Sequence, residues 1–207
     1  MSPDQEPTPA ADRPEQPGGT ARPLRAHARR NRENLVAAAR AAFAAADDTV
    51  PLEGIARRAG VGIGTLYRHF PTREALVEAV YAAELDAVTD SAATLVEELP
   101  PEQALRAWME RYAAFVATKR TMLNTLHSGW ASGRLATPVT RKRITAAIGA
   151  FLTAGARTGA LRADVEAEDV TAMVLGVFLS TGADAGPGRL ERRLGLVVDA
   201  LRPREGS

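Results

Sequence analysis

Four side chains that can donate hydrogen bonds lie close together in this 207-residue chain: Thr65, Tyr67, Arg68 and His69. A hydroxyl, a phenol, a guanidinium and an imidazole can each bond a phosphate oxygen or the edge of a base. An arginine can also donate two parallel bonds to guanine O6 and N7. A short helix that presents these groups outward would be suited to the major groove of DNA.

The residues around them, 52–70, have the pattern of two short helices joined by a glycine turn. The first helix carries apolar residues at the spacing of one buried face, at Leu52, Ile55, Ala56 and Ala59. Gly60 is predicted to end it, because glycine adopts the left-handed backbone found at many helix C-termini. The second helix is predicted to bury Leu66 and Phe70 and to leave the four polar side chains largely outward. This pattern predicts a helix-turn-helix.

Over about residues 27–85, the sequence resembles the N-terminal domain of TetR/AcrR-type bacterial regulators. The resemblance rests on Leu35 and Phe43, on IARRAGV at 55–61, on TLYRHF at 65–70 and on TREAL at 72–76. It implies an all-helical DNA-binding protein. The rest of the chain resembles the family only in its layout of helices.

The DNA-contacting residues that we expect are Gly62, Gly64, Thr65, Tyr67, Arg68, His69, Thr72 and Arg73. The resemblance implies that Thr65, Tyr67 and His69 contact phosphates or a base edge. Arg68 is the candidate for base readout, and a contact to phosphate alone is the alternative. His69 could instead be a neutral packing residue.

Residues on either side of this helix are expected to support it. Gly62 occupies the N-cap, where many relatives have Ser, and it lacks a phosphate-contacting hydroxyl. Gly64 lets the helix approach the bases closely. Thr72 is a good N-cap for the next helix, whose first residue, Arg73, is expected to meet a phosphate together with backbone N–H groups.

Charge is distributed unevenly although the net charge is only +1. Residues 1–20 carry −3, residues 21–73 carry +6 and residues 74–207 carry −2. Positive charge therefore lies on the segment with the helix-turn-helix, as expected for contact with phosphates. A solvated arginine-rich helix face is the plainer alternative.

Composition limits the class of protein further. The chain has no cysteine, which excludes disulfides, thiolate zinc sites and cysteine nucleophiles. Its three histidines lie in separate segments and no glycine-rich phosphate loop is present, so we expect no enzyme, no metal and no cofactor. The longest uncharged run, 170–183, is shorter than the roughly 20 residues of a membrane span. A soluble, cytoplasmic protein that makes no membrane contact is expected.

We predict an all-α fold of about nine helices, at 28–46, 52–59, 62–70, 72–98, 101–116, 122–130, 137–158, 166–182 and 188–202. Residues 1–24 are expected to form a disordered Pro-rich arm, either lying on DNA or serving as a solubilising tail. Residues 25–75 would form the helix-turn-helix domain. Residues 76–203 would form a helical bundle for ligand sensing and dimerisation.

Two sets of residues in the larger domain are candidate sites. Large side chains that could surround a small apolar ligand are Trp108, Tyr112, Phe115, Met122, Leu126, His127 and Trp130. Residues that could form an antiparallel four-helix dimer contact are Met173, Val177, Leu194, Val197, Val198 and Leu201. For each residue in both sets, packing in the chain's own core is the alternative.

These observations favour a ligand-responsive repressor that binds a palindromic DNA operator as a homodimer, because one recognition helix reads too few base pairs to find a site in a genome. Two alternatives stay open. One is a helical protein-interaction scaffold without specific DNA binding. The other is a transcriptional activator of the same fold.

Overall fold

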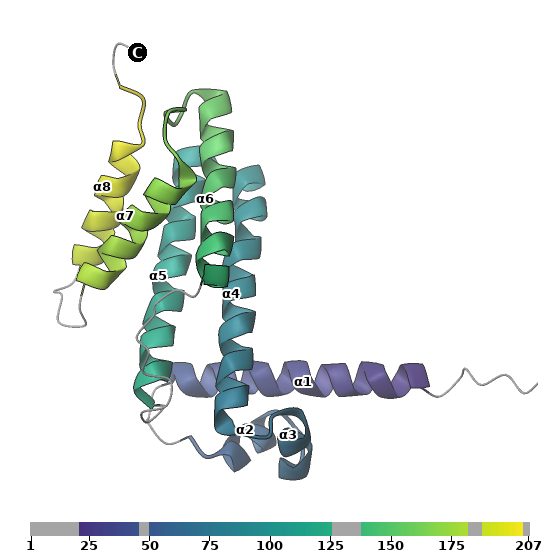
Figure 1. Cartoon of the computed structure of the whole chain (residues 1–207). Helices are drawn as coiled ribbons and strands as arrows, with labels where there is room; N and C mark the ends of the chain where they lie inside the picture. Colours follow the sequence, from purple (N-terminus) through teal and green to yellow (C-terminus); the bar gives the residue numbers. More distant parts are fainter. Residues whose placement is uncertain (1–20, 46–49, 126–137, 182–187, 205–207) are drawn as a thin grey trace, which may run out of the picture.

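The computed structural model describes residues 21–45, 50–125, 138–181 and 188–204, and the regular structure in these ranges is entirely helical. The elements are α1 (Ala21–Ala44), α2 (Leu52–Arg58), α3 (Ile63–His69), α4 (Arg73–Glu98), α5 (Pro101–Thr125), α6 (Pro138–Thr158), α7 (Ala167–Ser180) and α8 (Arg189–Ala200). The predicted all-α fold is confirmed. Helices α4, α5 and α6 run side by side, and α7 and α8 lie along one side of them (Figure 1). Near the N-terminal end of α4, helix α1 crosses α4 at a steep angle and lies next to α2 and α3 (Figure 1).

The described residues form eight helices rather than about nine. Helix α5 runs on to Thr125, where we predicted an end near residue 116 and a separate helix at 122–130. Residues 117–121 contain neither proline nor glycine, so nothing in the sequence stops the helix there. Residues 126–130 lie outside the described ranges.

The boundary of the predicted N-terminal arm is also wrong. Helix α1 begins at Ala21, so residues 21–24 are helical. The remainder of the predicted arm, 1–20, lies outside the described residues. Pro23 falls within the first turn of α1, where a missing N–H removes no helical hydrogen bond.

The first of two hydrophobic clusters, the N-terminal cluster, joins α1, α2, α3 and the start of α4. Its buried members are Leu35, Ala38, Ala39, Ala42, Phe43, Ile55, Ala56, Leu66, Phe70, Leu76, Val77 and Val80. The apolar stripe of α1 therefore packs on the backs of α2 and α3. Val61 is only half-buried against this cluster.

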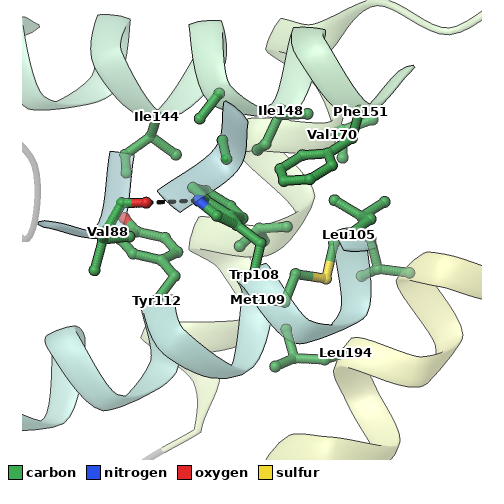
Figure 2. Packing of buried hydrophobic residues seen from close by; sticks show 14 of the residues in the cluster. Val88, Leu105, Trp108, Met109, Tyr112, Ile144, Ile148, Phe151, Val170 and Leu194 are labelled. Atoms are coloured by element: carbon green, nitrogen blue, oxygen red, sulfur yellow. Dashed lines mark hydrogen bonds between the residues drawn. The ribbon is translucent and has the colours of Figure 1, made fainter. Parts of the chain in front are cut away.

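The second hydrophobic cluster, the body cluster, fills the space between α4, α5, α6, α7 and α8. Its largest side chain is Trp108, which is fully buried and whose Nε1 donates a hydrogen bond to the Val88 carbonyl of α4 over 2.9 Å (Figure 2). Trp108 packs against Tyr112 and Phe151, with ring centroids 5.4 and 5.8 Å away. Aromatic rings of α5 and α6 thus form the centre of this cluster.

Helix α4 contributes to both clusters. Leu76, Val77 and Val80 belong to the N-terminal cluster, and the body cluster takes over from Leu85 onward. The predicted N-cap is confirmed, because the Thr72 hydroxyl accepts a hydrogen bond from the Ala75 N–H over 3.2 Å. One continuous helix therefore connects the two parts of the molecule.

None of the described helices combines the length and the apolar character needed to cross a lipid bilayer.

Candidate nucleic-acid interface

The turn between α2 and α3 is built by Gly60. Its φ of 71° lies in the left-handed region that disfavours residues with a Cβ. The Gly60 N–H bonds the Arg57 carbonyl over 3.1 Å, and the Val61 N–H bonds the Ala56 carbonyl over 3.0 Å. These two bonds form a Schellman motif, which satisfies carbonyls at the end of α2. The angle between α2 and α3 is therefore set by backbone hydrogen bonds.

Helix α3 has one buried face and one outward face. Leu66 and Phe70 are buried in the N-terminal cluster. Tyr67 is 46% exposed and Arg68 is exposed, whereas Thr65 and His69 are half-buried. The His69 ring lies 6.3 Å from that of Phe70, so His69 combines an accessible edge with a packing contact. Of the four polar side chains, Tyr67 and Arg68 are the most accessible.

Gly62 and Gly64 are exposed at the start of α3. Gly62 is the N-cap, in an extended conformation with φ −74° and ψ 152°, and no side chain caps this end. No atom lies within 4 Å of the position of a Cβ on either glycine. The protein itself therefore leaves both positions open to an incoming surface.

Arg73 has a different environment from the one we expected. Its Nη1 donates a hydrogen bond to the Val50 carbonyl over 2.8 Å, and its guanidinium lies 5.5 Å from the centre of the Phe43 ring. The side chain is half-buried and ties the segment before α2 to α1 and α4. The bond to Val50 uses one of the five N–H donors of the guanidinium, so the expected phosphate contact of Arg73 stays a prediction.

A second arginine, which is exposed, also lies next to an aromatic ring of this part of the molecule. The Arg32 guanidinium of α1 lies 5.1 Å from the centre of the Phe70 ring. The other exposed arginines here include Arg29, Arg30, Arg57 and Arg58. Arg57 and Arg58, in the last turn of α2, were not among the predicted contacts. The available signal was two successive arginines directly before the glycine turn.

The predicted ligand-pocket residues that can be placed lie in the body cluster. Trp108 and Tyr112 are fully buried, and their rings pack against other aromatic rings. Burial raises the pKa of the Tyr112 phenol above its ordinary value, which keeps the group neutral. Phe115 is buried too, but it also lines a groove between α1, α4 and α5. Trp108 and Tyr112 are thus core residues. The side chains of Met122, Leu126, His127 and Trp130 lie outside the described set.

Most of the predicted dimer residues also belong to the chain's own core. Leu194, Val197, Val198 and Leu201 are buried in the body cluster, which corrects their assignment to an outer surface. Val177 packs against the same cluster, and Met173 is 43% exposed. The sequence showed the apolar stripe of α8 but could not show whether that stripe faces inward or outward.

A short helix held on a three-helix core by Leu66 and Phe70, with Tyr67 and Arg68 facing outward, is the arrangement of a helix-turn-helix DNA-binding protein. Residues 35–80 match the family of bacterial regulatory proteins named tetR, and residues 100–203 match the C-terminal domain of SbtR-like transcriptional regulators. The chain belongs to the TetR family of DNA-binding transcriptional regulators.

Solved structures agree with this assignment. A TetR transcriptional regulator from Streptomyces coelicolor is 40% identical, with 83% of this chain and 98% of that chain covered and a TM-score of 0.66. A TetR transcription regulatory protein from Mycobacterium vanbaalenii is 35% identical, with 87% and 100% covered and a TM-score of 0.67. No curated protein gives a significant match.

Proposed function

We propose that this regulator binds a palindromic operator as a homodimer and represses transcription until a small ligand releases it. The observation that carries the proposal is the outward face of α3. Tyr67 and Arg68 are exposed there, while Leu66 and Phe70 anchor the helix from behind. A dimer seated on an operator would exclude other proteins from the same stretch of duplex, which is repression by occlusion.

Arg68 is the proposed base-reading residue. It is exposed in the last turn of α3, and a guanidinium can donate two bonds to guanine in the major groove. Tyr67 offers a donor on a rigid ring next to it. Thr65 and His69 are less accessible, so we assign them contacts at the groove wall. The exposed Arg57 and Arg58 are candidates for phosphate contacts.

The proposed dimer face lies on the outward sides of α7 and α8, which are neighbours (Figure 1). Leu179 is 64% exposed and Leu196 is 67% exposed, and Met173 and Gly176 of α7 are exposed as well. Arg193 of α8 donates to the Ser180 carbonyl and to the Thr181 hydroxyl at the end of α7, over 3.0 and 2.9 Å. The two helices are therefore held together as one face, and pairing with a second copy would give four helices.

The proposed effector is a small apolar molecule bound by the body of α4 to α8. Helix α4 supports the proposal, because it is packed into the body at one end and carries the N-terminal cluster at the other. A ligand can shift the protein between two conformations only if it binds one of them more tightly. Release from DNA therefore requires that the ligand favours an α4 position with the wrong separation of the two α3 helices.

Selection of bound sequences from a random pool of duplexes tests the DNA-binding proposal. The wild-type protein should select a palindrome. Arg68→Ala should lose discrimination at the contacted base pair, by roughly 1–3 kcal/mol. Arg157→Ala removes the same charge from an exposed position on α6 and should leave the preference unchanged. An unchanged preference in Arg68→Ala would show that this arginine does not read a base.

Light scattering coupled to size-exclusion chromatography tests the dimer. Leu179→Glu and Leu196→Glu place charges on the proposed face and should convert the protein to a monomer. Val139→Glu is the matched control, because Val139 is an equally exposed apolar residue on α6, away from this face. A wild-type protein that is monomeric at every concentration would refute the proposed dimer.

A further inference from the structure

The junction between the two hydrophobic clusters contains a nearly buried charge. Between Val80 and Leu85, helix α4 leaves one cluster and enters the other. Within this interval Glu84 is only 8% exposed, and its carboxylate forms an ion pair with the Arg40 guanidinium of α1. In the described part of the chain, this is the only ion pair that joins α1 to α4.

A surface groove lies on each side of this pair. A groove of about 390 Å³ lies toward the C-terminal end of α1 and includes Ala44, Ala87 and Ala114. A second groove, of about 370 Å³, lies toward the N-terminal end of α1 and includes Ala37, Ala79 and Ala83. Arg40 and Glu84 line both grooves. Val88, Phe115 and Arg111 also line the first groove. The ion pair bridges α1 and α4 between the two grooves.

The turn of α4 that contains Glu84 is also hydrogen-bonded to α6. The Tyr81 hydroxyl and the Thr140 hydroxyl lie 3.0 Å apart and share a hydrogen bond. Tyr81 and Glu84 are three residues apart, so they belong to one turn of the helix. Where α4 passes between the clusters, polar contacts tie it to α6 of the body and to α1 of the N-terminal part.

We propose that Arg40 and Glu84 are positioning residues for DNA recognition. The Glu84 side chain is 11% exposed, whereas the side chain of its partner Arg40 is 59% exposed. Removal of the cation would leave a mostly buried carboxylate without its partner, which is unfavourable. Sliding or tilting of α1 on α4 would separate the pair and is therefore opposed. The pair fixes the angle of the three-helix domain on the body. This inference rests on the proposed homodimer, in which that angle sets the separation of the two α3 helices.

The experiment compares binding to duplexes that carry the two selected half-sites with the spacer lengthened or shortened by single base pairs. Wild-type protein should prefer one spacer. In Arg40→Gln, the preference for that spacer should fall by about tenfold, within the usual range of coupling between sites. Affinity for a single half-site should stay within about twofold, because the ion pair of Arg40 lies on α4 and not on the recognition helix. Arg40→Lys keeps the cation and should retain the spacer preference.

Two further variants separate positioning from folding. Glu84→Gln leaves no buried charge behind, so it should fold and should relax the spacer preference as Arg40→Gln does. Arg202→Gln breaks an ion pair with Glu102 that lies within the body, and should keep the wild-type preference. Wild-type spacer preference in both Arg40→Gln and Glu84→Gln would overturn the proposal. So would an equal loss of single-half-site affinity, which indicates a folding defect.

A measurement without DNA keeps this inference distinct from the proposed function. The chain has no cysteine, so spin labels can be placed on Asn34→Cys in α1 and Ala150→Cys in α6, both exposed positions. An excess of unlabelled protein ensures that the measured distances join two labels within one chain. Their distribution should be narrow in the protein that retains Arg40 and broad in Arg40→Gln. Equal widths would refute the positioning role even if DNA binding is confirmed. If the wild-type protein selects no duplex but the distribution broadens, the proposed function fails and the ion pair keeps its positioning role.

Discussion

Aromatic rings have different neighbours in the two hydrophobic clusters. In the body cluster, rings pack on rings: Tyr112 lies 5.4 Å from Trp108 and 5.1 Å from Phe178. In the N-terminal cluster, each of the two phenylalanines lies next to an arginine. Arg73 is 5.5 Å from the Phe43 ring and Arg32 is 5.1 Å from the Phe70 ring. The small domain thus uses guanidinium groups where the body uses more apolar side chains.

This difference changes how the charge of the N-terminal part is understood. The +6 of residues 21–73 suggested a surface devoted to phosphates. Arg32 and Arg73 instead take part in the packing of the domain, and Arg40 pairs with Glu84. A small domain has too little interior to bury many large side chains, so cations that cover the edge of its core can add stability. Part of its positive charge is therefore structural.

The largest expected effect is in the body. Trp108→Ala removes the central ring of its cluster and should cost about 3–5 kcal/mol of the free energy of unfolding, through lost packing and a cavity. Urea denaturation followed by far-ultraviolet circular dichroism measures this. Val139→Ala, at an exposed position of α6, should stay within about 0.5 kcal/mol of the wild type. A comparable small loss in Trp108→Ala would mean that the ring stack contributes little.

A matching change in the N-terminal cluster should have a local effect. Leu66→Ala removes a fully buried side chain of α3 and should cost about 2–5 kcal/mol there. Trp108 lies in the body cluster, so its fluorescence, measured in a Trp130→Phe background, reports the unfolding of the body. We expect hydrogen exchange in α2 and α3 to rise and DNA binding to fall, with the fluorescence transition little changed. A parallel shift of the fluorescence midpoint would show that the clusters unfold as one.

Arg73→Gln tests whether the arginines of the small domain are structural. It removes the bond to the Val50 carbonyl and the contact with the Phe43 ring, and should destabilise this domain by about 2 kcal/mol. Thermal unfolding in the absence of DNA measures the effect. Arg57→Gln, at an exposed position of α2, is the control and should leave stability unchanged. Equal stability of Arg73→Gln and wild type would show that the contacts with Val50 and Phe43 add no stability.

The smallest expected effect concerns the uncapped start of α3. Gly62 has a φ of −74° and open space around it, so a side chain fits without strain. Gly62→Ser supplies an N-cap acceptor and should stabilise the N-terminal cluster by a few tenths of a kcal/mol. Denaturation of Gly62→Ser beside Gly62→Ala resolves the effect, since alanine is a poor N-cap. A destabilised serine variant would contradict the N-cap geometry.

The small domain was largely predictable from the sequence, because its signals are local. The period of Leu35, Ala39 and Phe43, the left-handed Gly60 and the N-cap at Thr72 each determine structure within a turn or two of helix. The exposed positions of Tyr67 and Arg68 follow from the burial of Leu66 and Phe70 on the same helix.

The rest depended on contacts between distant residues. Arg73 donates to the carbonyl of Val50, 23 residues earlier, and no residue near Arg73 in the sequence predicts this contact. The sequence alone shows that Leu194 and Val198 form an apolar stripe on α8. Only the packing of α5 against α8 shows that this stripe faces inward. The ion pair of Arg40 and Glu84 likewise joins two helices whose crossing no local pattern predicts.

Because α4 is shared, exchanging recognition domains between relatives has a defined requirement. A chimera joined between Val80 and Leu85 would take each hydrophobic cluster whole from one parent. It would nevertheless need a matched acid on α4 and base on α1, since the donor's first helix must meet the recipient's carboxylate. Chimeras without this matched pair should fold but should hold their α3 helices at the wrong angle to the body.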